Sequence, residues 1–274
     1  MVLHVFRVSA VVRRSVPLVA WSGSFLASIV KNLMSSDEVG CGFSLSPLQV
    51  VSGKGLRVVL SGFVGDSDGV VLDAGSRVLF RLTSFCRNFP SHFLTSLGNG
   101  VVGPFTVQSI DYEFIDVFPG GRAEDFINFI DVDSKGVVEV FFYPTILVFR
   151  GWRVLYPSPQ RIVFNLLKLA TDLLNLDPRL AKRRARVLSR NIELIKDCTE
   201  VVGIGIGRGR VVKAFMGRAL FGVTGLENLR DFVDLLKFGS LVGVGKSRGI
   251  GFGFYRFRVL PPRSRKTSRA DEGG

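Results

Sequence analysis

The sequence is poor in the residues that build metal centres and disulfide frameworks. Its 274 residues include only three cysteines and two histidines. Cys41, Cys86 and Cys198 lie far apart and form no Cys-x-x-Cys pair, so neither a zinc site nor a set of disulfides is indicated. We therefore expect no metal and no cofactor. Such sparse cysteine usage also fits a reducing cytoplasmic location.

Long apolar runs are lacking as well. The apolar residues after Arg13 and Arg14 have some features of a twin-arginine signal, but Pro17 and several serines interrupt them, and a helix pattern explains them better. The chain contains no uninterrupted stretch of about 18 apolar residues, the length that a membrane-spanning helix needs. We expect neither a transmembrane span nor a membrane partner.

Basic residues are scarce in the first half of the chain and abundant in the second. Residues 1–136 carry 11 Lys and Arg against 12 Asp and Glu, whereas residues 137–274 carry 25 against 11. A net charge of +13 concentrated in one half attracts polyanions. A basic surface that serves only solubility is the alternative, but it gives no reason for this segregation. With the membrane disfavoured, nucleic acid is the predicted partner.

Each half of the chain repeats one order of elements: strand, helix, two or more strands, helix, strand. In the first half we expect strands over residues 3–12, 43–50, 56–63, 77–85 and 105–118, with helices over 18–34 and 90–97. In the second half we expect strands over 137–149, 192–206, 211–223 and 249–259, with helices over 159–174 and 226–237. Ser158 and Pro159 form a helix-start signal, as N-cap and first helical residue.

This order is that of the ferredoxin-like fold. The sequence therefore predicts an α+β protein with two tandem ferredoxin-like (RRM-like) domains, whose antiparallel sheets carry helices on one face. We place the domains at residues 1–133 and 137–260, followed by a flexible basic tail over 261–274.

A glycine-rich segment lies between the last helix and the last strand. It is not a Walker loop, because Ser240 stands where that pattern needs glycine and because a helix precedes it. A dinucleotide fingerprint fails too, since its third glycine would fall on Arg248. A nucleotide-dependent enzyme is thus disfavoured.

The glycine-rich segment can still bind RNA. Successive glycines let the backbone approach a phosphate closely, and basic side chains add charge. The expected RNA contacts are Gly243, Gly245, Lys246, Ser247, Arg248, Gly249, Gly251 and Gly253. The alternative is a turn whose glycines serve close packing.

Two further basic segments are candidate RNA contacts. Gly207-Arg208-Gly209-Arg210 lies between two predicted strands, so Arg208 and Arg210 are placed at a hairpin tip, where a plain exposed turn is the alternative. Residues 179–190 are interpreted as a basic connection, and Arg183 and Arg184 within it are expected to contact the RNA backbone. A solvated face is the alternative there.

The glycine-rich segment also carries a family resemblance. The run Leu-Val-Gly-Val-Gly-Lys-Ser-Arg-Gly-Ile-Gly-Phe-Gly, between a helix and a strand, resembles the C-terminal loop of the CRISPR-associated repeat-RNA endoribonucleases of the RAMP superfamily. Similar segments are Phe142–Thr145, Tyr156–Pro159 and Val212–Arg218, with a looser likeness at Val16–Pro17 and Phe43–Leu48. Lys213 and Arg218 of the third segment join the expected RNA contacts.

The resemblance implies an activity. It implies cleavage of precursor CRISPR RNA within its repeats without a metal, by attack of a 2′-hydroxyl that leaves a 2′,3′-cyclic phosphate and a 5′-hydroxyl. It also implies that CRISPR repeat RNA is held across the cleft between the two domains. Whether the protein forms a homodimer or joins other subunits of a CRISPR effector complex is left open.

The candidate catalytic residues depart from the family pattern. Many members carry a histidine at or after the first helix, but this chain has none between Leu18 and Phe63. His4 and His92 are expected to be structural. Lys31 and Lys54 are the lysines of that region, and a lysine stabilises a charged transition state or transfers a proton when its pKa is lowered. Ordinary solvated lysines are the alternative. A non-catalytic subunit that binds guide RNA is the second hypothesis.

Overall fold

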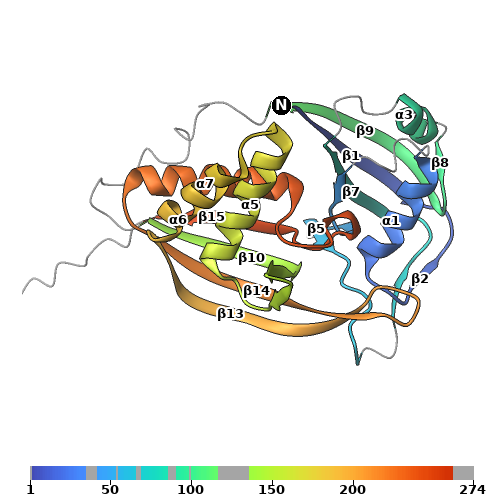
Figure 1. Ribbon diagram of the computed structural model, residues 1–274. Helices are drawn as coiled ribbons and strands as arrows, with labels where there is room; N and C mark the ends of the chain where they lie inside the picture. The colour runs from blue at the N-terminus through green and yellow to red at the C-terminus, as the bar shows by residue number, and fades with distance from the viewer. Residues whose placement is uncertain are drawn as a thin grey trace, which may run out of the picture.

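The computed structural model describes residues 2–34, 42–53, 55–65, 69–85, 91–98, 100–116 and 136–261. Two antiparallel sheets organise these residues, and Figure 1 shows them side by side. The predicted domain boundary at residues 131–136 falls almost entirely outside the described residues, as does the tail after Pro261.

The first sheet is built on the long strand β1 (Val2–Val12). Its strand order is β5-β4-β7-β1-β9-β8, and β3 pairs with β7. The other strands are β3 (Phe43–Leu45), β4 (Gln49–Ser52), β5 (Gly55–Val58), β7 (Arg77–Ser84), β8 (Val101–Val102) and β9 (Phe105–Asp116). A separate pair joins β2 (Val16–Leu18) to β6 (Val70–Leu72).

Two helices cover one face of this sheet. They are α1 (Ser22–Leu33) and α3 (Ser91–Gly98). Alternate residues of β1, among them Phe6 and Val8, pack against Leu26 of α1 and Phe93 of α3 in one apolar core. The central strands follow the ferredoxin-like order, because β4, β7, β1 and β9 are neighbours and the helices lie between β1 and β4 and between β7 and β9.

The second sheet has the strand order β13-β14-β10-β15. Its strands are β10 (Gly136–Thr145), β13 (Ile192–Gly205), β14 (Val211–Val223) and β15 (Tyr255–Leu260). The helices α5 (Pro159–Leu174) and α7 (Leu226–Val242) pack on one face through Ile162, Leu166, Phe232 and Leu236. The predicted α+β class and ferredoxin-like order are therefore confirmed for both sheets.

Several predicted boundaries differ from the observed ones. The strand expected over 43–50 divides into β3 and β4, the one expected over 56–63 ends at Val58, and the one expected over 249–259 begins at Tyr255 because the glycines before it form a turn.

The strand expected over 137–149 divides at Ile146 into β10 and the short strand β11 (Leu147–Phe149), after a register shift between Phe142 and Thr145 in the pairing with β14. Helix α7 continues past Lys237 because Phe238 and Gly239 are buried. Ser158 is the N-cap of α5 as predicted, but its hydroxyl makes no capping hydrogen bond.

The segment over residues 179–190 is a helix, and the prediction of a connection was wrong. Helix α6 spans Pro178–Ser189, and its N-cap Asp177 accepts a hydrogen bond from the backbone N–H of Arg179 at 2.9 Å. Ala181, Ala185 and Leu188 recur at helical spacing and are buried. The many basic residues between them hide this short apolar stripe in the sequence.

The two domains pack directly against each other. Leu3 and Val5, on the face of β1 that α1 and α3 do not cover, join the core that contains Leu235 and Phe238 of α7. Thr83 of β7 donates a hydrogen bond to the Leu241 carbonyl at 2.8 Å, and the Arg81 guanidinium donates to the Ser240 carbonyl. These carbonyls belong to the last turn of α7, which has no intrahelical donors left for them. Burial lowers the pKa of Arg81 to about 10, so the guanidinium stays charged at neutral pH.

Candidate nucleic-acid interface

The glycine-rich loop runs from the end of α7 to the start of β15 and is wedged between the domains. Its short 3-10 turn covers Arg248–Ile250. From the first domain, the Trp21 indole donates to the Ile250 carbonyl at 2.8 Å. A Cβ on Gly23, in the first turn of α1, would lie 2.1 Å from the same carbonyl oxygen. The loop and the start of α1 therefore fit together at backbone distance.

Most of the loop glycines are required by packing inside the protein. Gly243, Gly245, Gly251 and Gly253 all have positive φ angles and are buried. A Cβ on Gly245 would lie 2.2 Å from the Ile146 carbonyl oxygen, and one on Gly253 would lie 1.8 Å from that of Val244. The Gly245 N–H donates to Asn165 Oδ1 at 2.7 Å, and the Gly253 N–H donates to the Pro144 carbonyl at 2.8 Å. These two donors are used within the protein, and RNA contact by the glycines stays a prediction.

The polar residues of the loop differ in exposure. Lys246 is exposed, while Ser247, Arg248 and Gly249 are half-buried. The Arg248 guanidinium lies 5.9 Å from the centroid of the Phe85 ring. Burial lowers the pKa of Arg248, and the charge of Asp172 partly opposes this. Lys246 is thus the loop's most accessible cation.

The predicted hairpin tip lies next to the first domain. Gly207, Arg208 and Gly209 have consecutive positive φ angles between β13 and β14, and both Arg208 and Arg210 are exposed. At the base of the tip, the Gly205 N–H donates to the Gly62 carbonyl at 2.7 Å, and the Trp21 N–H donates to the Gly205 carbonyl at 2.9 Å. The tip is therefore anchored to the first domain beside α1.

Three predicted features meet around one tryptophan that the sequence did not single out. Trp21 is completely buried and packs with Ile204 of β13, Ala214 of β14 and Phe252 of the glycine-rich loop. The start of α1, the hairpin and the loop therefore share one small apolar cluster between the domains. The sequence offers one signal for the role of Trp21: it stands directly before a helix whose first turn is Ser-Gly-Ser.

The remaining predicted contacts lie apart from this cluster. Lys213 and Arg218 are exposed on β14, and Arg183 and Arg184 are exposed on α6. Figure 1 shows α6 at the far left, on the side of the second domain away from α1. The basic surface therefore extends around the second domain rather than converging on one point.

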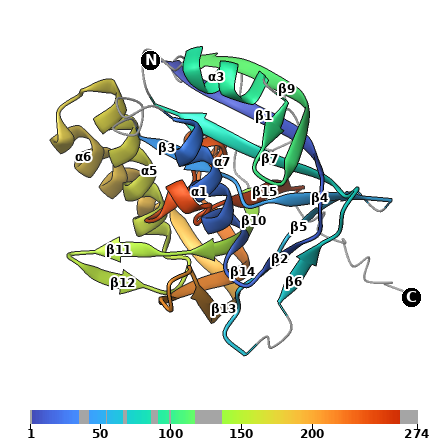
Figure 2. The same ribbon diagram turned by 90° about the vertical axis from the view of Figure 1, so that its right-hand side faces the viewer.

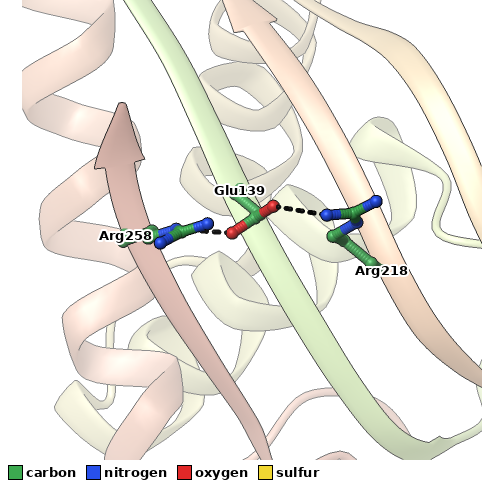
Figure 3. Close-up of polar contacts among 3 residues, drawn as sticks. All are labelled: Glu139, Arg218 and Arg258. Carbon is green, nitrogen blue, oxygen red and sulfur yellow. Dashed lines mark hydrogen bonds and ion pairs between the residues drawn. The ribbon is translucent and has the colours of Figure 1, made fainter. Parts of the chain in front are cut away.

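Arg218 takes part in an ion-pair network (Figure 3). Glu139 Oε1 lies 3.4 Å from Arg218 Nη1, and Glu139 Oε2 lies 2.5 Å from Arg258 Nε. The Glu139 side chain is only 14% exposed, whereas those of Arg218 and Arg258 are 51% and 68% exposed. Two guanidinium groups share one carboxylate, so the network keeps a net positive charge on the open face of the sheet.

Of the two candidate catalytic lysines, the structure describes only Lys31. Lys31 is exposed in the last turn of α1, about 15 Å along the helix axis from Trp21 at a rise of 1.5 Å per residue. Lys54 lies outside the described residues. His4 is buried in β1, where its Nδ1 lies 2.8 Å from the Tyr112 hydroxyl, and His92 belongs to α3. Lys31 is therefore not brought together with Lys246.

Two negative findings concern only the described part of the chain. Within it, no three His, Cys, Asp or Glu side chains are grouped in a way that would hold a metal ion. No helix among those residues has the length and apolar character needed to cross a membrane.

Comparison with known proteins gives one family and many structures. Residues 140–255 match the family model described as CRISPR-associated endoribonuclease Cas6. No curated protein matches the chain by sequence. A Cas6 product complex is 16% identical with a TM-score of 0.54, over 94% of this chain and 100% of that chain. Cas6 of Thermus thermophilus is 13% identical with a TM-score of 0.57, over 93% of this chain and 98% of that one.

A longer relative is similar as well. A chain of a partial Cas6-RT-Cas1–Cas2 complex is 9% identical with a TM-score of 0.62, and the match covers 94% of this chain but only 46% of that one. At such low identity these structures establish the fold alone, and the family model adds evidence from sequence. The predicted resemblance is thereby confirmed: this chain is similar to the CRISPR-associated endoribonuclease Cas6 family in the sequence of its second domain and in fold along nearly its whole length.

Proposed function

We propose that this protein is an endoribonuclease that cleaves CRISPR repeat RNA. The observation that carries the proposal is the match of residues 140–255 to the Cas6 family model. The ferredoxin-like strand order of both sheets and the charge of the second half support it. Exposed cations around the second domain provide the contacts that a phosphate backbone needs. They include Lys246, Arg208, Arg210, Lys213, Arg183 and Arg184.

The proposed reaction is internal attack within the RNA. The 2′-hydroxyl attacks the adjacent phosphorus, its proton leaves to a base, and the 5′-oxygen departs with a proton. The products are a 2′,3′-cyclic phosphate and a 5′-hydroxyl, and the step needs no metal. Lys31 lies on the exposed surface of α1, where an ammonium group stabilises the negative charge that develops on the phosphorane. Lys54 is proposed for the same role.

The experiment is single-turnover cleavage of the repeat RNA in excess EDTA. We expect cleavage in chelator, and none when the 2′-hydroxyl at the cut position is replaced by hydrogen. Failure to cut the unmodified RNA, or equal cutting of the 2′-deoxy RNA, would sink the mechanism.

The catalytic lysine is tested in the same assay. Lys31→Ala should slow cleavage about 100-fold, within the range for loss of one catalytic group, without weakening RNA binding. Lys31→Arg keeps the positive charge, so it should retain much of the rate if Lys31 acts electrostatically. Asn32→Ala changes the exposed neighbour on the same turn and should leave the rate unchanged. A full rate for Lys31→Ala would remove this residue from the site.

A second function is favoured by the position of the histidines. None lies between Leu18 and Phe63, and His4 is buried against Tyr112. A subunit that binds guide RNA without cutting it fits this arrangement. Tight, salt-dependent binding of repeat RNA with no cleavage product would favour this function over the first.

A further inference from the structure

A small hairpin projects from the second domain just before α5. Its strands are β11 and β12 (Trp152–Val154), and Figure 2 shows them extending to the lower left, away from the two sheets. Arg150 and Gly151 form the two-residue turn, with φ angles of 48° and 86°. Two positive φ angles in succession are typical of the tight turn that closes a hairpin. Leu147 is fully buried and fixes the base of the hairpin to the core.

The tip of this hairpin exposes aromatic side chains to solvent. Trp152 is 79% exposed, whereas Trp21, the chain's other tryptophan, is completely buried. Phe149 pairs with Trp152 across the hairpin. The Arg161 guanidinium lies 3.4 Å from the centroid of the Phe149 ring. Arg150 approaches the same ring at 5.2 Å. Phe149 is therefore engaged by two cations, while the indole of Trp152 is left open.

The charge around the hairpin has one sign. No Asp or Glu lies between Glu139 and Asp172 in the sequence, whereas Arg150 and Arg153 are both exposed on the hairpin. The hairpin is also continuous with the glycine-rich loop, because the Lys246 N–H donates to the carbonyl of Ile146 at 2.8 Å, directly before β11. The backbone of Lys246 therefore lies at the base of the hairpin, whose tip carries exposed arginines and an exposed indole.

We infer that this hairpin holds an unpaired nucleotide of the bound RNA. The base stacks on the Trp152 indole, and the flanking phosphates contact Arg150 and Arg153. Flat aromatic faces bind any base by stacking, and neighbouring arginines hold the backbone, which together are the usual means of recognising single-stranded nucleic acid. The inference rests on the proposed binding of repeat RNA and adds to it a contact with a segment outside any base-paired stem.

Tryptophan fluorescence reports on this contact directly. Trp21 is buried, so quenching caused by RNA should come from Trp152. Repeat RNA with an unpaired flank should quench the wild-type protein and a Trp21→Phe variant, and should leave a Trp152→Phe variant nearly unquenched. A change in Trp152 emission with protein concentration alone would instead indicate a second copy of the chain on the hairpin and would overturn the inference.

Binding measurements separate stacking from folding. Trp152→Ala should weaken binding of the flanked RNA about 5- to 150-fold, and Trp152→Phe, which keeps an aromatic face, should restore most of the loss. An RNA trimmed to its paired stem should bind both variants and the wild-type protein equally. Equal binding of flanked RNA by wild-type and Trp152→Ala protein would overturn this contact while leaving the proposed function intact. Failure of the wild-type protein to bind any repeat RNA would instead refute the proposed function.

Discussion

Gly253 occupies a position in the loop between the domains where a side chain would not fit. Its φ angle is +76°, and an added Cβ would lie 1.8 Å from the Val244 carbonyl oxygen. Gly253→Ala should lower the free energy of unfolding by about 3 kcal/mol, at the upper end of ordinary single substitutions. Urea unfolding followed by circular dichroism measures this.

Gly209→Ala is the matched control. Gly209 also has a positive φ, of +68°, but a Cβ added there would meet nothing within 4 Å. Only the backbone cost of about 1 kcal/mol is expected there. Equal losses in the two variants would show that backbone conformation, rather than close packing, requires glycine at position 253.

The sequence located the loop residues but only partly indicated what they do. The glycines between 243 and 253 were predicted to approach a phosphate, with close packing as the alternative, and the structure supplies packing partners for most of them. A glycine needed for a positive φ angle or for close packing against a carbonyl cannot be distinguished in the sequence from a glycine that exposes its backbone to a phosphate. Trp21 and Trp152 were not predicted, because exposure distinguishes their roles and single-sequence patterns do not reveal it.

At the level of elements, α6 is expected to contribute charge to RNA binding. Arg183 and Arg184 are exposed on it, and each lysine or arginine that neutralises a phosphate adds to the salt dependence of affinity. Replacing both by alanine should reduce the slope of log affinity against log salt by about 1.4 to 1.8, at about 0.7 to 0.9 per lost phosphate contact. Filter binding at several salt concentrations measures the slope.

Lys168→Ala provides the comparison for α6. Lys168 is exposed on the neighbouring α5, but it pairs with Asp172 at 3.3 Å. Its loss should change the slope less than the loss of either arginine. An unaltered slope in the double variant would exclude α6 from the RNA contact.

Helices and strands were predicted correctly where the pattern of apolar residues was long. The strands of the β13–β14 hairpin and the helix α5 were found within a residue or so, because their apolar patterns extend over ten or more residues. Helix α6 was missed because only Ala181, Ala185 and Leu188 mark its buried stripe among many arginines. The β11–β12 hairpin was missed because two three-residue strands give too little alternation to detect.

At the level of the whole molecule, the contact between β7 and the end of α7 should stabilise the packing of the domains. Thr83 is fully buried and donates to the Leu241 carbonyl. The usual donor for that carbonyl, the Gly245 N–H, is already bonded to Asn165. Thr83→Val keeps the shape and removes the donor, so it should cost about 1 to 2 kcal/mol of unfolding free energy. Thermal unfolding of this variant measures the loss.

Thr106→Val is the control for this interface. Thr106 lies on β9 of the same sheet and is exposed. It should leave the stability within about 0.5 kcal/mol of wild type. If the Thr83→Val protein is as stable as the wild type, the Thr83 hydroxyl does not hold the two domains together.

The arrangement of the domains was the least predictable part of the structure. Element order indicated two ferredoxin-like sheets, but the contact of Leu3 and Val5 with the core of the other sheet has no signature in the sequence. Residues 3–6 of β1 are buried on both faces of the sheet, whereas Arg7 is exposed. Neither an alternating nor a continuous apolar pattern predicts this combination. Docking depends on side chains that meet from distant positions, and a single sequence does not record such pairs.

The hydrogen bond from Trp21 to Ile250 has a consequence for the order in which the protein folds. The two residues are 229 positions apart, so a growing chain contains Trp21 long before it contains the partner. The first sheet draws its strands from residues 2–116 and can assemble during this interval. Completion of the interface then waits for the glycine-rich loop, and closing so distant a contact is slow compared with local steps. We therefore expect refolding of the whole chain to show a late phase in which the two domains dock. Residues 2–116 refolding alone should lack this phase.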